Sequence, residues 1–211
     1  MRAAEKLIAS KGLENITIRE IVDAAGQKNE SALQYHFQNL TGLVRAVHAV
    51  RDKQIHEMRA VQIEKLARKT GTPSLRDVCK LMIGPAFLLA KSKPDFRQYV
   101  KAFGHELALT DQSALKIVRR QGGDTEHEIN RLLRSVLPSL DDAAFERRLD
   151  GAVRFIASSM YHEARRPNAF RGDQAELFFS SLIDSLAGLL GAPESTETKA
   201  AARSLAKTQM Q

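Results

Sequence analysis

The sequence predicts an all-α protein, in which a small N-terminal three-helix unit precedes a larger helical region. Apolar residues recur at helical spacing along almost all of the 211 residues, and alternating β-branched runs are nearly absent. The chain has only 6 prolines, so few helices need be interrupted. Hydrophobic residues make up 43% of the chain, which is enough to build a packed core.

Capping and stop signals delimit three short helices at the N-terminus. We expect the first over residues 2–10, where apolar residues share one face. Thr17 and Glu20 have the spacing of a capping box, so a second helix begins after Thr17 and ends at Gly26. A polar turn then leads into a third short helix over residues 31–37. Two short helices joined in this way are typical of a helix-turn-helix.

Longer helices follow this unit. Asn39 is placed to cap a long fourth helix, and Ser74 with Asp77 to cap the next. We expect Gly84 and Pro85 to kink or break that helix, because proline removes a backbone donor and clashes with the preceding turn.

The chain divides into three predicted regions. Residues 1–50 form the helix-turn-helix unit, and residues 51–191 form the larger helical region. Two amphipathic helices, over residues 141–165 and 173–190, close that larger region. We expect residues 192–211 to be a polar tail, frayed or disordered.

Composition and charge exclude several classes of protein. The single cysteine, Cys79, cannot form an intrachain disulfide, which fits a reducing compartment. The longest strongly apolar run, residues 81–90, is shorter than the roughly 20 residues of a membrane span. Charged residues near Met1 argue against a signal peptide, so we expect a cytoplasmic protein. The net charge of +7 permits nucleic-acid binding but does not establish it.

Motifs of known enzymes are absent from the sequence. None of the His-Glu dipeptides continues as H-E-x-x-H, the spacing that places two histidines on one helical face for zinc. No nucleophile elbow and no glycine-rich phosphate loop occurs. We therefore expect neither an enzyme, nor a metal site, nor a cofactor.

Three segments of the first fifty residues occur in a specific order. Residues 16–26 read ITIREIVDAAG, residues 33–37 read LQYHF, and Gly42-Leu43 follows. This pattern resembles the TetR family of transcriptional regulators. The resemblance implies an N-terminal domain that binds double-stranded DNA through its third helix. It also implies a C-terminal domain that binds a small effector and forms a homodimer through its last two long helices.

The resemblance places eight candidate DNA-binding residues around the third helix. Gln34 is the candidate for base readout, because glutamine can pair with adenine in the major groove. An alternative for Asn29 and Ser31 is helix capping, and for Tyr35 and His36 packing against the fourth helix. The full set is Thr17, Lys28, Asn29, Ser31, Gln34, Tyr35, His36 and Thr41.

The same resemblance implies an effector pocket and a dimer interface in residues 51–191. The pocket candidates are Cys79, Met82, Phe87, Tyr99, Phe103, His105 and Met160, although at helical spacing most of these residues could equally be core. The interface candidates are Phe145, Leu149, Val153, Ile156, Leu182 and Leu186.

The function that follows is a repressor that binds a palindromic operator as a homodimer and is released by a small molecule. An alternative is a helical ligand-binding or scaffold protein that has lost specific DNA binding. It is kept because Leu40 stands where the family usually carries a basic residue.

Overall fold

The structure is a computed structural model that describes residues 1–27 and 29–209, with the side chains of residues 30, 32, 121, 122 and 209 left out. Over this part of the chain it consists of α-helices, one short 3-10 turn and no strand, which confirms the predicted all-α class. The elements are α1 (Arg2–Lys11), η1 (Leu13–Asn15), α2 (Ile18–Ala24), α3 (Glu30–Phe37), α4 (Leu40–Ala67), α5 (Leu75–Ser92), α6 (Pro94–Phe103), α7 (Glu106–Leu109), α8 (Ala114–Val136), α9 (Asp142–Ala164), α10 (Gly172–Gly191) and α11 (Thr196–Gln209).

The predicted caps form as the sequence indicates. The Thr17 hydroxyl accepts from the backbone N–H of Glu20 at 3.2 Å, and the Glu20 carboxylate accepts from the Thr17 N–H at 2.8 Å. Hydrogen bonds from Lys11 and Thr17 lower the pKa of Glu20 to about 2. The Asn39 side chain caps α4 by accepting from the Gly42 N–H at 2.9 Å. These local bonds fix where the short helices begin.

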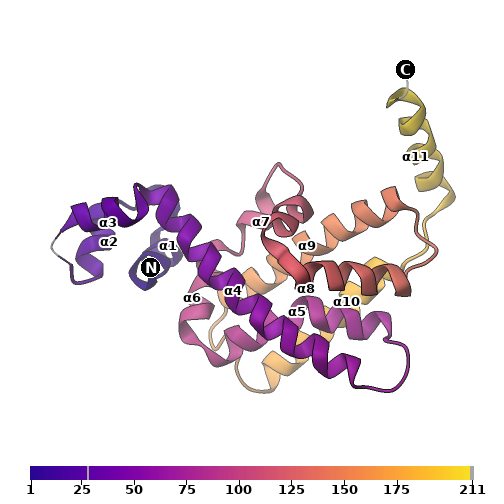
Figure 1. Ribbon diagram of the computed structural model, residues 1–211, viewed down its shortest axis with the longest axis horizontal. Coiled ribbons are helices and arrows are strands. Elements are labelled where there is room, and N and C mark those ends of the chain that lie inside the picture. Colours follow the sequence, from indigo (N-terminus) through magenta and orange to yellow (C-terminus); the bar gives the residue numbers. More distant parts are fainter. Residues whose placement is uncertain (28, 210–211) are drawn as a thin grey trace.

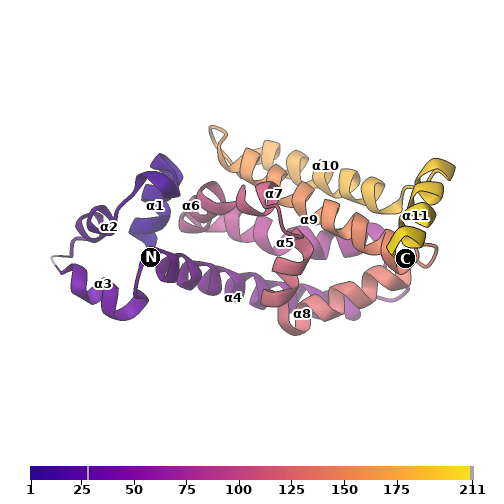
Figure 2. The same ribbon diagram turned by 90° about the horizontal axis from the view of Figure 1, so that it is seen from above.

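The helices form two regions that share the long helix α4 (Figure 1). At the N-terminus, α1, α2 and α3 gather around the start of α4, which then runs along the larger region. There α10 lies on one outer side, α4 and α8 lie on the opposite side, and α5 and α9 lie between them (Figure 2). The main hydrophobic core fills the space between these layers.

Helix α5 is continuous across Gly84 and Pro85, so the expected break is wrong. Both residues are buried, and a Cβ on Gly84 would lie 2.8 Å from Gln62 Oε1 of α4. The apolar surface that α5 buries outweighs the one backbone hydrogen bond that Pro85 removes. Ser74 and Asp77 also form the predicted capping box at the start of this helix.

The C-terminal tail is helical, which corrects the expectation of a frayed or disordered segment. Helix α11 projects from the end of the larger region, and most of its residues are exposed (Figure 1). The Ser195 hydroxyl accepts from the Thr198 N–H at 3.2 Å, and the segment is rich in the strong helix former alanine. In the described residues no single helix is long and apolar enough to cross a membrane; α10 and α11 pass that test only as a pair bent by 60°.

A buried ion cluster joins the two regions at α1, α4 and α6. The Arg51 guanidinium donates to both carboxylate oxygens of Glu5 at 2.7 Å and to Asp95 at 3.2 Å. Arg51 and Glu5 are almost fully buried. Burial alone would lower the pKa of Arg51, but the hydrogen bonds and charges of Glu5 and Asp95 raise it on balance. The predicted boundary at residue 50 therefore lies inside a continuous, cross-linked helix.

Candidate DNA-binding surface and internal cavity

The exposed surface of α3 carries three consecutive polar or aromatic side chains. Gln34, Tyr35 and His36 are all exposed, and Tyr35 reaches 84% exposure. The Tyr35 and His36 rings meet edge to face, with centroids 5.3 Å apart. Phe37 at the end of the helix packs against the N-terminal hydrophobic cluster instead. This surface can supply a carboxamide, a phenol and an imidazole to a ligand.

The other candidates flank α3. The Asn29 side chain accepts from the Ser31 N–H at 2.9 Å, so Asn29 has the capping role that was one of its two alternatives. The Thr17 hydroxyl is already engaged by Glu20 in the cap of α2, and Thr41 is exposed in the first turn of α4. Lys28 lies outside the described residues. The contact of each with DNA stays a prediction.

Comparison with known proteins identifies this surface. Residues 1–47 match the family described as bacterial regulatory proteins, tetR family. The N-terminal domain of this chain is a domain of the TetR type. The match covers α1, α2, α3 and the first part of α4, so it supports a transcriptional regulator of the TetR type that binds DNA. No curated protein matches the chain.

The larger region of the protein contains an internal cavity of about 260 Å³. It lies between α4, α5, α6, α7, α8 and α9, and most of its wall is apolar. Four of the predicted pocket residues line it: Met82, Tyr99, Phe103 and Met160.

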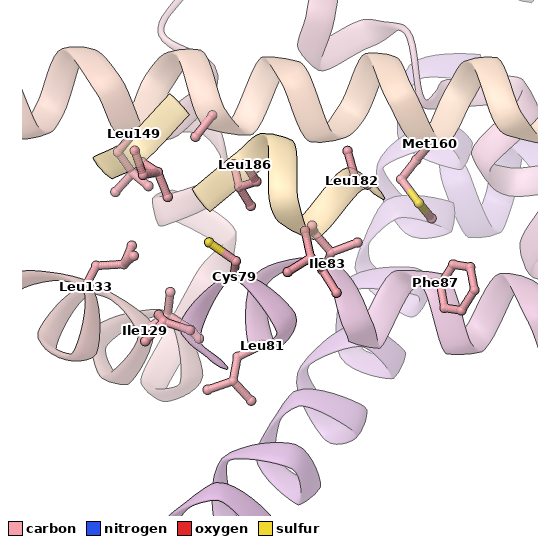
Figure 3. Close-up of a cluster of buried hydrophobic side chains, with 14 of the residues drawn as sticks. Cys79, Leu81, Ile83, Phe87, Ile129, Leu133, Leu149, Met160, Leu182 and Leu186 are labelled. Carbon is pink, nitrogen blue, oxygen red and sulfur yellow. The ribbon is translucent and has the colours of Figure 1, made fainter. Parts of the chain in front are cut away.

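Three predicted pocket residues do not line the cavity. Cys79 and Phe87 lie on a neighbouring row of α5, where they belong to the buried cluster with Leu182 and Leu186 (Figure 3). Burial raises the pKa of the Cys79 thiol to about 12. The Phe87 ring stacks on Phe179 of α10, with centroids 4.3 Å apart.

His105 is the third correction. Its ring lies beside Tyr161 with centroids 5.2 Å apart, and it is not among the residues that line the cavity. Residues 79, 83 and 87 follow one helical row of α5, whereas Met82 and Ala86 on the neighbouring row face the cavity. Periodicity identified both rows as apolar but could not tell which one would meet a cavity.

Sequence reasoning missed the polar wall of the cavity. It is formed by one face of α4, with spacings of four, four and three residues, and the members are His48, Asp52, His56 and Arg59. Glu106 and Glu126 add two carboxylates from α7 and α8. The helical spacing of the four polar residues was a usable signal, but a polar stripe on a long helix is usually a solvated face.

Three of the four polar residues of α4 make defined contacts. The His48 Nδ1 lies 3.1 Å from the Tyr99 hydroxyl, and its Nε2 lies 3.2 Å from a carboxylate oxygen of Glu106. The His56 Nδ1 lies 2.8 Å from the Thr125 hydroxyl oxygen. Arg59 pairs with Glu126 at 3.1 Å.

Asp52 and Arg59 are perturbed by burial. Burial raises the pKa of Asp52, although the nearby charges of His48, His56 and Arg59 oppose that shift. Burial lowers the pKa of Arg59, against the opposing charges of Glu126 and Asp52. Arg59 is only 9% exposed, and within the described residues its Nε–H finds no hydrogen-bond partner. No group of three or more His, Cys, Asp or Glu side chains in the described part of the chain could hold a metal ion.

The six predicted interface residues point into the protomer, which corrects that assignment. Four of them, Phe145, Leu149, Leu182 and Leu186, are buried in its own core. The other two, Val153 and Ile156, line the cavity. The apolar rows of α9 and α10 form the core of the protomer itself. A second protomer can therefore contact only the outward-facing rows of these helices.

Proposed function

We propose that this protein is a cytoplasmic repressor of the TetR family that binds a palindromic operator as a homodimer and is released by a small molecule in the internal cavity. The observation that supports it best is the course of α4. Its first turns pack in the N-terminal cluster through Leu43 and Val47, and the following turns form the polar wall of the cavity. A ligand that moves this helix moves the DNA-binding surface with it.

Helix α6 supplies a second connection. Phe103 lines the cavity and also belongs to the N-terminal cluster that contains Ala4 and Ile8 of α1. Effector binding that displaces Phe103 therefore disturbs the packing of α1. Coupling free energies between two such sites are typically about 1–3 kcal/mol. A change in the half-site spacing of about 34–36 Å between the two recognition helices would be enough to weaken operator binding.

We assign the homodimer interface to the outward rows of α9 and α10. On α10, Leu177 is 60% exposed and Gly188 is exposed. A Cβ on Gly151 of α9 or on Gly188 would meet nothing within 4 Å, so both positions leave room for the close approach of another helix. These rows replace the buried residues that the sequence pattern suggested.

The decisive test is a gel shift with the DNA that flanks the protein's own gene, against scrambled DNA of equal length, at two salt concentrations. We expect a discrete complex that survives competitor DNA. A plot of log K against log salt concentration should have a slope of about −0.9 for each phosphate neutralised. Equal binding to both DNAs, erased by salt, would contradict operator recognition. That result would favour a helical ligand-binding protein without specific DNA binding.

A further inference from the structure

One carboxylate of the cavity wall has no direct partner among the described residues. Arg59 and Glu126 form an ion pair with both side chains largely buried. Glu106 lies 3.2 Å from His48 Nε2. The Asp52 carboxylate makes no hydrogen bond or ion pair with any described residue, and the charges of His48, His56 and Arg59 act on it only at longer range. Asp52 is therefore the carboxylate of the wall that is left for a ligand to pair with.

We propose that the cavity binds a small apolar molecule that carries a basic nitrogen, with Asp52 as the counter-ion for that nitrogen. An unpaired carboxylate beside apolar surface is costly, and an organic cation that enters with its own apolar body removes that cost. The inference rests on the proposed effector role of the cavity and names the class of molecule that fills it.

An anionic ligand fits this wall poorly. Arg59 carries the one guanidinium among the described lining residues, and it is already paired with Glu126. The wall also carries Asp52, Glu106 and Glu126 as carboxylates. A bound anion would face the unpaired Asp52 carboxylate in a setting where such repulsion is weakly screened.

Arg59 provides a second polar point for the ligand. Its buried Nε–H is unpartnered in the described part of the chain and can donate to a neutral oxygen acceptor. Asp52 and Arg59 are seven residues apart on the same face of α4, which corresponds to about 10 Å along the helix axis. The ligand is thus expected to have a basic nitrogen near one end and a carbonyl or hydroxyl oxygen toward the other.

The cavity volume sets the size of the apolar body. A cavity of about 150 Å³ holds benzene, and this one measures about 260 Å³. Tyr99 and Phe103 offer aromatic faces in the wall. A fused two-ring body matches both the volume and the lining.

The test compares three naphthalenes of nearly equal size that differ in charge: 1-naphthylmethylamine, 1-naphthylmethanol and 1-naphthylacetate. Binding is measured by titration calorimetry and by naphthyl fluorescence, which is uncomplicated because the chain has no tryptophan. We expect the amine to bind best and the anion worst. The Asp52→Asn variant is expected to lower affinity for the amine about tenfold or more and to leave the alcohol unchanged.

Glu57→Gln is the matched control, since Glu57 is an exposed carboxylate on the outer side of the same helix. It should leave all three affinities unchanged. A carboxamide added to the far ring of the amine should tighten binding to the native protein, and that gain should disappear in Arg59→Lys.

Tighter binding of the anion than of the amine, no loss of amine affinity in Asp52→Asn, or no binding of any of the three would overturn the inference. Operator binding is measured separately by gel shift, so the two ideas can fail independently. If the protein shifts its operator in the gel but shows no preference for the amine, only the proposed ligand class is wrong. If the protein prefers the amine but binds no operator, the proposed regulator function is wrong and the proposed ligand class stands.

Discussion

Asp52 is a carboxylate whose buried surroundings disfavour its ionised form. It faces the mostly apolar cavity from α4, and burial raises its pKa. Such a group lowers the stability of the empty protein at neutral pH. A residue of this kind is expected where a ligand supplies the missing partner.

We predict that Asp52→Asn stabilises the ligand-free protein at neutral pH. A carboxyl whose folded-state pKa lies above its unfolded value costs nothing while it is protonated in both states. It destabilises the fold progressively as the pH rises above the unfolded-state pKa, and the full cost is reached above the raised folded-state pKa. The melting temperatures of variant and native protein should therefore coincide at acid pH and separate as the pH rises, with the variant higher. Thermal unfolding followed by circular dichroism across this range measures the difference, and a lower melting temperature for the variant at pH 7 would contradict it.

Two exposed residues of α3, Gln34 and His36, are expected to have different roles in DNA recognition. Gln34→Ala should lose discrimination at one base position, on the order of 1–3 kcal/mol, because a bidentate contact to adenine is lost. His36→Ala should weaken binding about equally on all sequences, as loss of a phosphate contact does. Competition gel shifts with single-base operator variants distinguish the two effects. A changed sequence preference in His36→Ala would show that the two roles are assigned incorrectly.

At the scale of the elements, the cluster of Arg51, Glu5 and Asp95 ties three helices together. Arg51 reaches from α4 to α1 and α6, and its guanidinium also lies 5.8 Å from the centre of the Phe96 ring. It therefore holds the DNA-binding helices against the region that contains the cavity. The geometry is bidentate and buried, the arrangement in which an ion pair resists separation most strongly.

We predict that Arg51→Met lowers the free energy of unfolding by about 3–5 kcal/mol, because Glu5 is left as an unpaired buried carboxylate. The double variant Glu5→Leu, Arg51→Met should recover most of that loss. Arg2→Met is the control, since the exposed Arg2 lies 3.7 Å from Asp95 and a surface pair contributes about 0–1 kcal/mol. Urea unfolding provides the measurement, and a double variant as unstable as the single one would show that the charge of Glu5 is not the cause.

At the scale of the whole molecule, one side is covered by α10 (Figure 2), on which Leu177 and Gly188 are exposed. An operator with two half-sites requires two recognition helices, and therefore two protomers. Leu177→Arg is expected to shift the protein from dimer to monomer and to abolish the discrete operator complex. The measurement is light scattering coupled to size exclusion.

Val61→Arg is the matched control for that prediction, because Val61 is 47% exposed on α4, the helix on the side of the larger region opposite α10 (Figure 2). It should leave the dimer intact. A Leu177→Arg protein that remains dimeric would place the interface elsewhere on the surface.

Local signals were sufficient for most of the helix boundaries and for the family. The capping box at Thr17, the caps at Asn39 and Ser74, and the ordered segments around α3 all act within a few residues, so they are visible along the chain. The continuity of α5 across Pro85 was not visible in this way, because it depends on how much surface the helix buries against its neighbours.

Only tertiary packing determines what each face of a helix contacts. Periodicity marks a row as apolar, but the neighbouring helices determine whether that row meets the core, a cavity or a second protomer. Cys79 and Phe87 therefore lie in the core, while Ile156 borders the cavity. The polar row of Asp52 and Arg59 could not be distinguished from a solvated helix face along the chain, because its burial depends on α8 and α9, which lie far away in sequence. Contacts between distant segments, rather than local preference, create the site.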